Sequence, residues 1–362
     1  MTTSASDDRA SSLPRGAAAT SAPASGGPPD SLIAISYAHL ARLGLSAPGT
    51  QPSWRLLGGG VSNWVLRFDV AQGVVVKQAL DRLRVQEEWL ADPRRAVLEG
   101  QAMAVLGARL PDGDVPRVLF VDEAACLVGM TSASEFALPW KQLLLHGDAD
   151  RRDAAAVGGL LGRLHGAAWD DSRLAAHYGD LSLFDQLRLD PYHEHAARAA
   201  ERRGDLALAA LLRAGAQAMR EDRRTLVHGD FSPKNLMIHD HAAMALDFEV
   251  VHWGNPDFDT AFLLTHLALK AIYRPKAADR YAACARAFLD AYMRVLDRRP
   301  AAAVEAGALR QAGALLVARA DGKSPAEYLS PGGRLRARAL GAAVLRGELR
   351  GLSELFSSQE GP

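Results

Sequence analysis

The chain has 362 residues, of which 48% are hydrophobic, and its 42 basic and 42 acidic side chains give a formal net charge of zero. This length supports one large domain or two ordinary ones with a buried core, while the balanced charge gives no electrostatic support to a nucleic-acid or anionic-membrane partner. The two cysteines, Cys126 and Cys284, lie in apolar surroundings. We therefore expect reduced core thiols and a cytoplasmic protein without a membrane-spanning segment.

Residues 1–29 consist mainly of Ser, Ala, Gly and Pro, and they contain no apolar segment of the kind that a secretory signal requires. This composition predicts a disordered tail. Helical spacing of apolar residues then runs from Asp30 to Leu45 and predicts the first element of the fold.

Residues 54–68 alternate like a strand, break at three consecutive glycines and then resume the alternation. Such a hairpin can lay backbone N–H groups against phosphate oxygens, because no Cβ keeps the ligand away. A triple glycine also suits any tight turn, and the segment lacks the Gly-Lys-Ser/Thr ending of a P-loop. The candidate phosphate-binding residues are Gly58, Gly59, Gly60, Ser62 and Asn63.

Lys77 lies in a short apolar stretch, residues 73–79, that is typical of a buried strand. A buried ammonium is costly unless an anion pairs with it, although an edge-strand lysine could instead reach solvent. Glu99 is the expected partner, because it shares a helical face with Met103 and other apolar residues. Glu87 and Glu88 are the competing partners.

The helix that carries Glu99 is expected to begin at Asp92 and Pro93, since Asp is a good N-cap and Pro suits the first helical position. Residues 115–123 and 126–130 predict a hairpin that closes a small sheet. The next segment, residues 131–139, has no periodicity and predicts a connection between two parts of the chain.

Helical patterns dominate the following stretch. A His-Gly-Asp triplet ends at Asp148 and is expected to form a turn, with Asp148 or Asp150 capping a helix that starts near Arg151. The adjacent glycines Gly158 and Gly159 in that helix indicate close packing against a neighbour. Residues 181–191 are expected to be irregular, and residues 192–218 to be helical.

A strand-like segment leads into a polar loop at His228-Gly-Asp230, which is followed by Asn235 and, after two short apolar segments, by Asp247-Phe-Glu249. Three oxygen ligands can therefore converge. Phosphoryl transfer needs such a set, in which one Asp orients and deprotonates a hydroxyl while an Asn and a second Asp hold Mg²⁺. Oxygen donors without a Cys or His cluster fit Mg²⁺ better than zinc.

This combination resembles the catalytic and metal-binding loops of the aminoglycoside phosphotransferase and choline kinase superfamily. The resemblance implies an α+β fold of the two-lobe protein-kinase type, with a small antiparallel β lobe in residues 30–131 and a larger, mainly helical lobe in residues 132–362. It also implies that Asp230 is the catalytic base, that Asn235 and Asp247 are Mg²⁺ ligands, and that ATP or GTP is the co-substrate.

The same resemblance assigns roles to residues outside the motif. Lys77 and Glu99 would form the pair that orients the nucleotide phosphates, and Met130 is a candidate wall of the adenine pocket, although a Met there is as often plain core. Asp259 resembles the aspartate that braces the catalytic loop. His165 resembles a recurrent superfamily histidine, but a hydrogen-bonded core histidine is the favoured interpretation.

About ten residues separate Glu249 from the next predicted helix, which leaves little room to seat a polypeptide and favours a small acceptor. The predicted function is therefore ATP-dependent transfer of phosphate to a hydroxyl of a small molecule. A nucleotide-binding regulatory protein of the same fold and a protein kinase stay open as alternatives. His252 and Trp253 could face the acceptor or pack in the loop.

Two helix starts are expected further along. Asp257 and Asp259 are N-cap candidates for an apolar helix from Thr260. Ser324, Pro325 and Glu327 form a capping-box pattern that predicts a helix restart.

Overall fold

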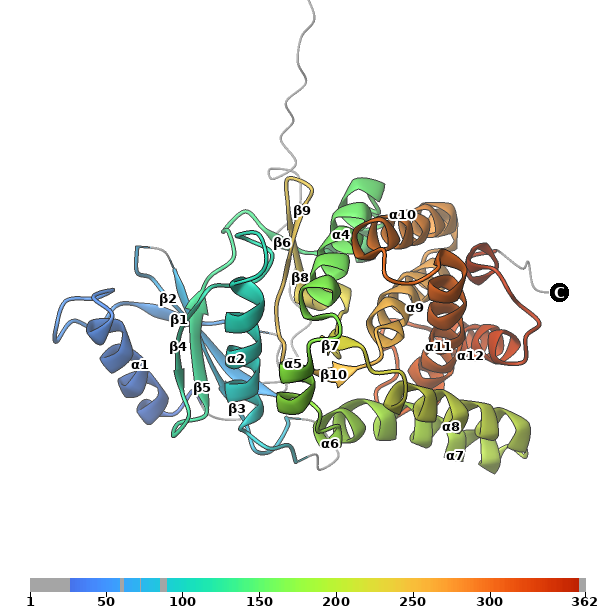
Figure 1. The fold of residues 1–362 in the computed structure, drawn as a ribbon, viewed down its shortest axis with the longest axis horizontal. Coiled ribbons are helices and arrows are strands. Elements are labelled where there is room, and N and C mark those ends of the chain that lie inside the picture. The colour runs from blue at the N-terminus through green and yellow to red at the C-terminus, as the bar shows by residue number, and fades with distance from the viewer. Residues whose placement is uncertain (1–26, 59–61, 72, 85–89, 358–362) are drawn as a thin grey trace, which may run out of the picture.

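The computed structural model describes residues 27–58, 62–71, 73–84 and 90–357. Gly59, Gly60, Glu87 and Glu88 therefore lie outside the described residues, as does most of the predicted N-terminal tail. Two lobes are visible in Figure 1, a small one built on a sheet and a larger one made mainly of helices. The α+β, two-lobe fold predicted from the sequence is confirmed.

The small lobe is a five-stranded antiparallel sheet in the order β1-β2-β3-β5-β4. Its central strands are short and rich in Val, a residue that suits a pleated, half-buried surface. The strands are β1 (Trp54–Leu56), β2 (Asn63–Phe68), β3 (Val74–Ala79), β4 (Val118–Asp122) and β5 (Leu127–Thr131).

One helix covers each face of this sheet (Figure 1). Helix α1 (Asp30–Arg42) packs Leu32 and Leu40 into a small core with Phe68. Helix α2 (Arg95–Gly107) lies so close to the other face that a Cβ on Gly100 would come within 2.7 Å of the Val121 side chain. The position of α2 fixes the carboxylate of Glu99 relative to the strand that carries Lys77.

Helix α2 begins later than the sequence predicted. Asp92 accepts a hydrogen bond from the backbone N–H of Arg94 at 2.8 Å, so it caps a single turn that precedes the helix. The backbone N–H groups of Arg95 and Ala96 bond three residues back, to Asp92 and Pro93, and only after that turn does the α-helix start. The predicted N-cap role of Asp92 is therefore wrong, because the helix itself starts at Arg95.

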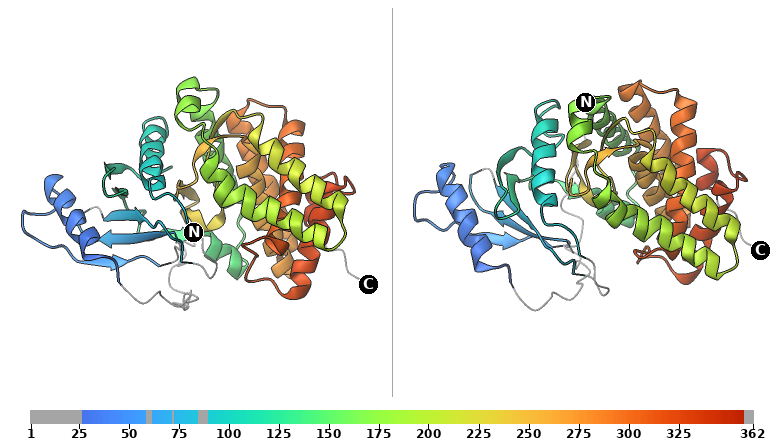
Figure 2. Two further views of the ribbon diagram at one scale, coloured as in Figure 1. Left: turned by 90° about the horizontal axis from the view of Figure 1, so that it is seen from below. Right: turned by 60° about the horizontal axis from the view of Figure 1, so that its bottom comes forward.

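The large lobe is mainly helical, as Figure 2 shows, and it contains two small sheets, of which the one with β8 and β9 lies on the side that faces the small lobe (Figure 1). The sheets have the orders β6-β8-β9 and β10-β7. Their strands are β6 (Leu138–Pro139), β7 (Thr225–Val227), β8 (Leu236–His239), β9 (Ala242–Ala245) and β10 (His252–Gly254). The helices are α3 (Trp140–His146), α4 (Arg151–Ala168), α5 (Ser172–His177), α6 (Ser182–Phe184), η1 (Asp185–Glu194), α7 (His195–Arg202), α8 (Leu206–Arg220), η2 (Pro233–Asn235), α9 (Asp257–Tyr273), η3 (Pro275–Ala277), α10 (Ala278–Leu296), α11 (Ala301–Asp321), α12 (Pro331–Leu345) and η4 (Leu352–Leu355).

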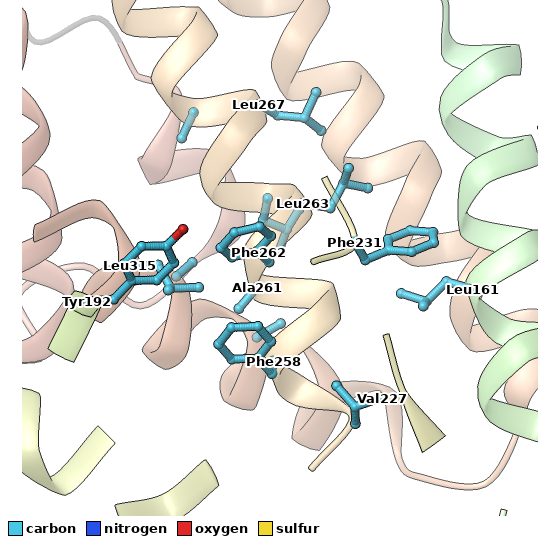
Figure 3. Close-up of a cluster of buried hydrophobic side chains, with 14 of the residues drawn as sticks. Leu161, Tyr192, Val227, Phe231, Phe258, Ala261, Phe262, Leu263, Leu267 and Leu315 are labelled. Atoms are coloured by element: carbon cyan, nitrogen blue, oxygen red, sulfur yellow. The ribbon is translucent and has the colours of Figure 1, made fainter. Parts of the chain in front are cut away.

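The core of the large lobe is organised around α9, which is apolar on almost all sides. Tyr192 stacks on Phe262 of this helix with ring centroids 6.0 Å apart. On the other side of α9, Phe231 from the loop after β7 points toward Leu161 of α4 (Figure 3). The catalytic loop predicted from the sequence is therefore anchored by its own apolar residue in the main core.

Two expectations about helices were wrong. Residues 181–191 are not irregular, because α6 runs directly into η1, a π-helix that contains Pro191. The capping-box pattern at Ser324 does not start a helix, because its hydroxyl accepts a hydrogen bond from Arg319 instead. Helix α12 begins seven residues later, where Ser330 caps the N–H of Gly333 at 3.1 Å.

Other helix starts agree with the sequence. Gly147 takes a left-handed conformation after α3, and Asp150 caps α4 through the N–H of Arg152. Among the described helices, α11 is long and apolar enough to cross a membrane, but 61% of its apolar window is buried inside the protein. Burial of this kind is typical of a core helix.

Candidate active site

The loop between β7 and β8 brings the predicted motif together, and its backbone explains why glycine follows the histidine. Gly229 has φ +74°, and a Cβ there would lie 2.5 Å from the carbonyl oxygen of Val250. Asp259 accepts hydrogen bonds from the N–H groups of His228 and Gly229 at 2.7 and 3.0 Å. A buried carboxylate thus fixes the turn that presents Asp230.

Asp259 is itself held by His165, whose Nε2 lies 3.1 Å from the carboxylate and whose Nδ1 lies 2.9 Å from the Tyr292 hydroxyl. His165 is therefore a hydrogen-bonded core residue, the interpretation that the sequence favoured. The expected N-cap roles of Asp257 and Asp259 are wrong, because α9 begins at Asp257 and the Asp259 carboxylate braces the loop, as the resemblance implied. Asn255 accepts a hydrogen bond at 2.9 Å from the N–H of Asp257, the first residue of α9.

Asp230 is 3% exposed and lies between two cations. Its Oδ2 is 3.1 Å from Nη2 of Arg188 and 2.9 Å from Nζ of Lys234. Burial raises the pKa of Asp230, but the charges of Lys234 and Arg188 outweigh this effect and lower the pKa below its ordinary value. The carboxylate is therefore an anion at neutral pH and can accept a hydrogen bond from a hydroxyl.

Lys77 pairs with Glu99, as the sequence predicted, at 2.7 Å between Nζ and Oε2. The same ammonium also contacts the carboxylate of Asp247. Burial opposes the charge on Lys77, but Asp247 and Glu99 outweigh it and raise the pKa of Lys77. Burial raises the pKa of Glu99 to about 7, whereas the pKa of Asp247 is lowered because Lys77 and Lys234 overcome its burial.

Asn235 and Asp247 lie next to each other at the open end of the β8–β9 hairpin. The N–H of Leu246 donates to the carbonyl of Asn235 at 2.8 Å, which sets the two side chains at the same end. The amide nitrogen of Asn235 donates to the carbonyl of Asp230 at 2.9 Å, so its Oδ1 is left as an acceptor. Asp247 has φ +70°, an uncommon conformation for a non-glycine residue that often marks a functional site.

One amide oxygen and one anionic carboxylate fit Mg²⁺, which completes its octahedral shell with water and phosphate oxygens. The described residues contain no group of three or more His, Cys, Asp or Glu side chains able to hold a metal ion on their own. His228 links the two loops, since its Nδ1 accepts from the N–H of Asp230 at 3.2 Å and its Nε2 donates to the carbonyl of Leu246 at 3.0 Å. Burial lowers the pKa of His228 and keeps the ring in this neutral form.

Glu249 joins the two lobes. Its carboxylate accepts hydrogen bonds from the Ser62 hydroxyl and the Asn63 amide, both at 2.9 Å, and from Nε of Arg95 at 3.3 Å. The side chains of Ser62 and Asn63 are therefore engaged by Glu249 in this arrangement. Their contact with phosphate stays a prediction.

The remaining predicted residues lie at the edges of the site or outside it. Gly58 is exposed just after β1, and Met130 is buried in β5. His252 stacks on Phe184 with ring centroids 3.9 Å apart and is 2% exposed, and Trp253 is 6% exposed, so both pack in the interior. Burial lowers the pKa of His252 to about 4.

Three charged residues of the site were missed from the sequence: Arg188, Lys234 and Arg95. Lys234 stands four residues after Asp230, and this spacing was available as a signal. Arg188 lies on η1, about forty residues before the loop, and Arg95 lies in a helix of the other lobe. No pattern in an Arg-rich sequence separates these two from surface arginines.

A family model described as "Phosphotransferase enzyme family" matches residues 52–302 of the chain. Methylthioribose kinase of Geobacillus thermodenitrificans (strain NG80-2) is 26% identical over 263 residues, and the match spans 66% of this chain and 66% of that protein's length.

Similar solved structures include amicoumacin kinase hAmiN in complex with AMP-PNP, Ca²⁺ and Ami, with 15% identity, a TM-score of 0.55 and coverage of 89% of this chain and 94% of that one. A glucosamine kinase has 18% identity and a TM-score of 0.51, with coverage of 86% of this chain and 84% of that one. At these identities the structures support the fold.

Proposed function

The chain belongs to the phosphotransferase enzyme family, and from that premise we propose that it transfers the γ-phosphate of ATP to a hydroxyl of a small molecule in a Mg²⁺-dependent reaction. The observation that carries the proposal is the convergence of Asp230, Asn235 and Asp247 in one site with the Lys77–Glu99 pair. Phosphoryl transfer depends on positioning and charge stabilisation, and these residues supply both.

Asp230 is the proposed catalytic base. Its carboxylate is buried, ionised and oriented by Arg188 and Lys234, so it can accept the proton of an attacking hydroxyl or align that hydroxyl. Lys234 has a side chain that is 51% exposed. It can therefore move between the carboxylate and the oxygens of a transferring phosphate.

Lys77 would hold the nucleotide phosphates, with Glu99 keeping its ammonium in place. Asn235 and Asp247 would hold Mg²⁺, which supplies charge neutralisation on the phosphates when it is bound. The contact between Lys77 and Asp247 must then loosen, since both groups would turn to their ligands. Gly58, Gly59, Gly60, Ser62 and Asn63 are the proposed cover of the phosphates, and Met130 the proposed wall of the adenine site.

These roles assign a different function to each lobe. Residues 30–131 would form the nucleotide-binding lobe, which ends with β5 at Thr131, and residues 132–362 the catalytic and acceptor-binding lobe. The match to the methylthioribose kinase supports a small hydroxylated acceptor. A cytoplasmic location and the absence of nucleic-acid and membrane partners remain predictions from the sequence.

The test is ADP release with Mg·ATP, and separately with Mg·GTP, across a panel of small hydroxyl compounds. Asp230→Asn serves as the blank, and its turnover should fall by about 10²–10⁴-fold with little change in nucleotide affinity. A compound that raises ADP release in the natural protein alone supports the proposal. Nucleotide binding without turnover on any acceptor would favour a regulatory protein, and phosphorylation of a protein substrate would favour a protein kinase.

A further inference from the structure

A second group of cations lies next to the catalytic loop and has no role in the chemistry above. It consists of Lys141 at the start of α3, Lys270 near the end of α9 and Arg319 near the end of α11, and we call it the basic cluster. Helix α3 packs against η2, which carries Lys234. The charge of Lys234 also acts on Lys141, so the basic cluster lies beside the loop that carries Asp230.

Lys270 is the central member. The residue is 1% exposed, yet its ammonium donates a single hydrogen bond to a described residue, a long one of 3.4 Å to the carbonyl of His266. It also faces the ring of Tyr328, with Nζ 5.6 Å from the centroid. Within the described part of the chain no ion pair to Lys270 is present, although a buried ammonium is normally paired with an acid.

The charges around Lys270 are repulsive. Burial lowers the pKa of Lys270 to about 7, and the positive charges of Lys141 and Arg319 contribute to this lowering. Burial also lowers the pKa of Lys141; the charge of Glu327 opposes this, whereas Lys234 and Arg319 reinforce it. Glu327 is exposed and does not reach the interior ammonium. Several basic side chains thus lie together, and no carboxylate of a described residue pairs with the buried one.

Two further donors near Lys270 have no partner. The hydroxyl of Tyr328 and Nε of Arg319 are buried and make no hydrogen bond to any described residue. Arg319 uses another nitrogen to donate to the hydroxyl of Ser324 at 3.0 Å. Buried polar groups are normally satisfied, so unpaired donors beside an unpaired ammonium indicate a ligand that brings acceptors and negative charge.

We infer that the phosphate acceptor carries an oxyanion, a carboxylate or a phosphate, which binds to Lys270, Arg319 and Tyr328 while its hydroxyl lies at Asp230. This inference rests on the proposed function, because it identifies the acceptor of the same site. A cationic acceptor would be repelled by the basic cluster, and a neutral one would leave its donors unsatisfied. Specificity of this kind comes from buried polar groups that only the correct ligand satisfies.

The first experiment compares matched hydroxyl compounds as acceptors in the ADP-release assay. Gluconate, glucose and glucosamine form one set, and glycerate, glycerol 3-phosphate and glycerol form another. An anionic member should exceed its neutral counterpart in kcat/KM by at least about tenfold, and the second set separates carboxylate from phosphate. A neutral or cationic compound as the best acceptor would overturn the inference.

Lys270→Met should remove this preference and raise the KM of the anionic acceptor by about tenfold or more, with smaller changes for neutral compounds. Lys276→Met, on an exposed lysine just beyond α9, is the matched control and should behave like the natural protein. Tyr328→Phe removes one hydrogen-bond donor with little change in shape, and it should also weaken the binding of the anionic acceptor. An unchanged preference in Lys270→Met contradicts the assignment.

A direct binding measurement covers the case in which no compound in the panel is turned over. The protein is saturated with Mg·AMP-PNP, and its melting temperature is measured in sodium sulfate and in sodium chloride at equal ionic strength. Sulfate stabilises folded proteins in general, so the melting temperature should rise in all three proteins, but more in the natural protein and Lys276→Met than in Lys270→Met. No difference between the natural protein and Lys270→Met overturns the anion site alone, whereas no shift with Mg·AMP-PNP counts against the proposed function.

Discussion

Asp230 owes its proposed role to the two cations around it. Arg188 also donates from Nε to the carbonyl of Gly229 at 2.6 Å, so it holds both the loop backbone and the carboxylate. Lys234 reaches the same carboxylate oxygen from the solvent side. One cation is buried and fixed, and the other can move. We therefore expect the removal of Arg188 and the removal of Lys234 to have different effects on catalysis.

Arg188→Met should lower kcat by about 10–100-fold, because Asp230 loses its fixed partner and the Gly229 carbonyl loses its donor. Lys234→Met is the comparison, since it removes the other cation and leaves the backbone contact intact. Its main effect should fall on kcat with ATP, through lost stabilisation of the transferring phosphate. Steady-state kinetics of both variants check this, and natural turnover in Arg188→Met would contradict it.

The pH dependence of activity should show the depressed pKa of Asp230. The useful form is the carboxylate, which is fully present above the ordinary aspartate pKa of about 4 and is lost only as the pH falls through the lower folded-state value. No loss of kcat/KM due to Asp230 is therefore expected between pH 7 and pH 5, within the range where the protein stays folded. Arg188→Met should move the acid limb to higher pH. An acid limb that Arg188→Met leaves at the same pH would contradict the assignment of Asp230 as the base.

At the scale of elements, the sequence was most informative where spacing and chemistry coincide. The Lys77–Glu99 pair could be predicted because each residue lies in an apolar segment, where a buried charge requires a partner of opposite sign. Ser324 was mistaken for a helix start because Ser-Pro occurs again at Ser330, and a tertiary contact with Arg319 decides between them. Arg188 could not be found, since only the path of η1 brings it to the loop.

The contact between α4 and α10 offers a test of packing with a built-in control. A Cβ on Gly158 would lie 2.1 Å from the carbonyl oxygen of Phe288, which is backbone and cannot move aside. A Cβ on Gly159 would meet only the flexible end of Arg163, at 3.3 Å, and Val295 at 4.0 Å. The packing of the two helices therefore requires glycine at position 158 but leaves room for a Cβ at position 159.

Gly158→Ala should lower the free energy of unfolding by about 1–3 kcal/mol, since it forces the two helices apart. Gly159→Ala should leave that free energy unchanged or raise it by up to about 1 kcal/mol, because Ala is the better helix former. Urea unfolding of both variants measures the difference. Equal effects would show that close approach of α4 and α10 is not what requires glycine at position 158.

At the scale of the whole molecule, the two lobes have partly separate interiors. The α1 side of the sheet forms its own small core around Phe68 and Val76, while Met103 and Leu106 of α2 belong to the main core. Glu249 is one of the polar links between the lobes, alongside the contact of Lys77 with Asp247, and it takes the place of the glycine in the protein-kinase Asp-Phe-Gly motif. Through Ser62 and Asn63 it ties the start of β2 to the loop that carries Asp247.

This link predicts an energetic coupling between the lobes in the absence of ligand. In a double-mutant cycle, Asn63→Ala and Glu249→Ala should together cost less than the sum of their separate effects, with a coupling of about 1.5–3 kcal/mol in the free energy of unfolding. The control cycle pairs Asn63→Ala with Glu305→Ala, whose side chain contacts Arg286 on the far side of the large lobe, and it should be additive to within about 0.5 kcal/mol. The coupling exists only while Asn63 and Glu249 are in contact. Additivity in the first cycle would therefore mean that the lobes are separated at this contact in the free protein. Glu249 would then join the lobes only after a ligand has bound.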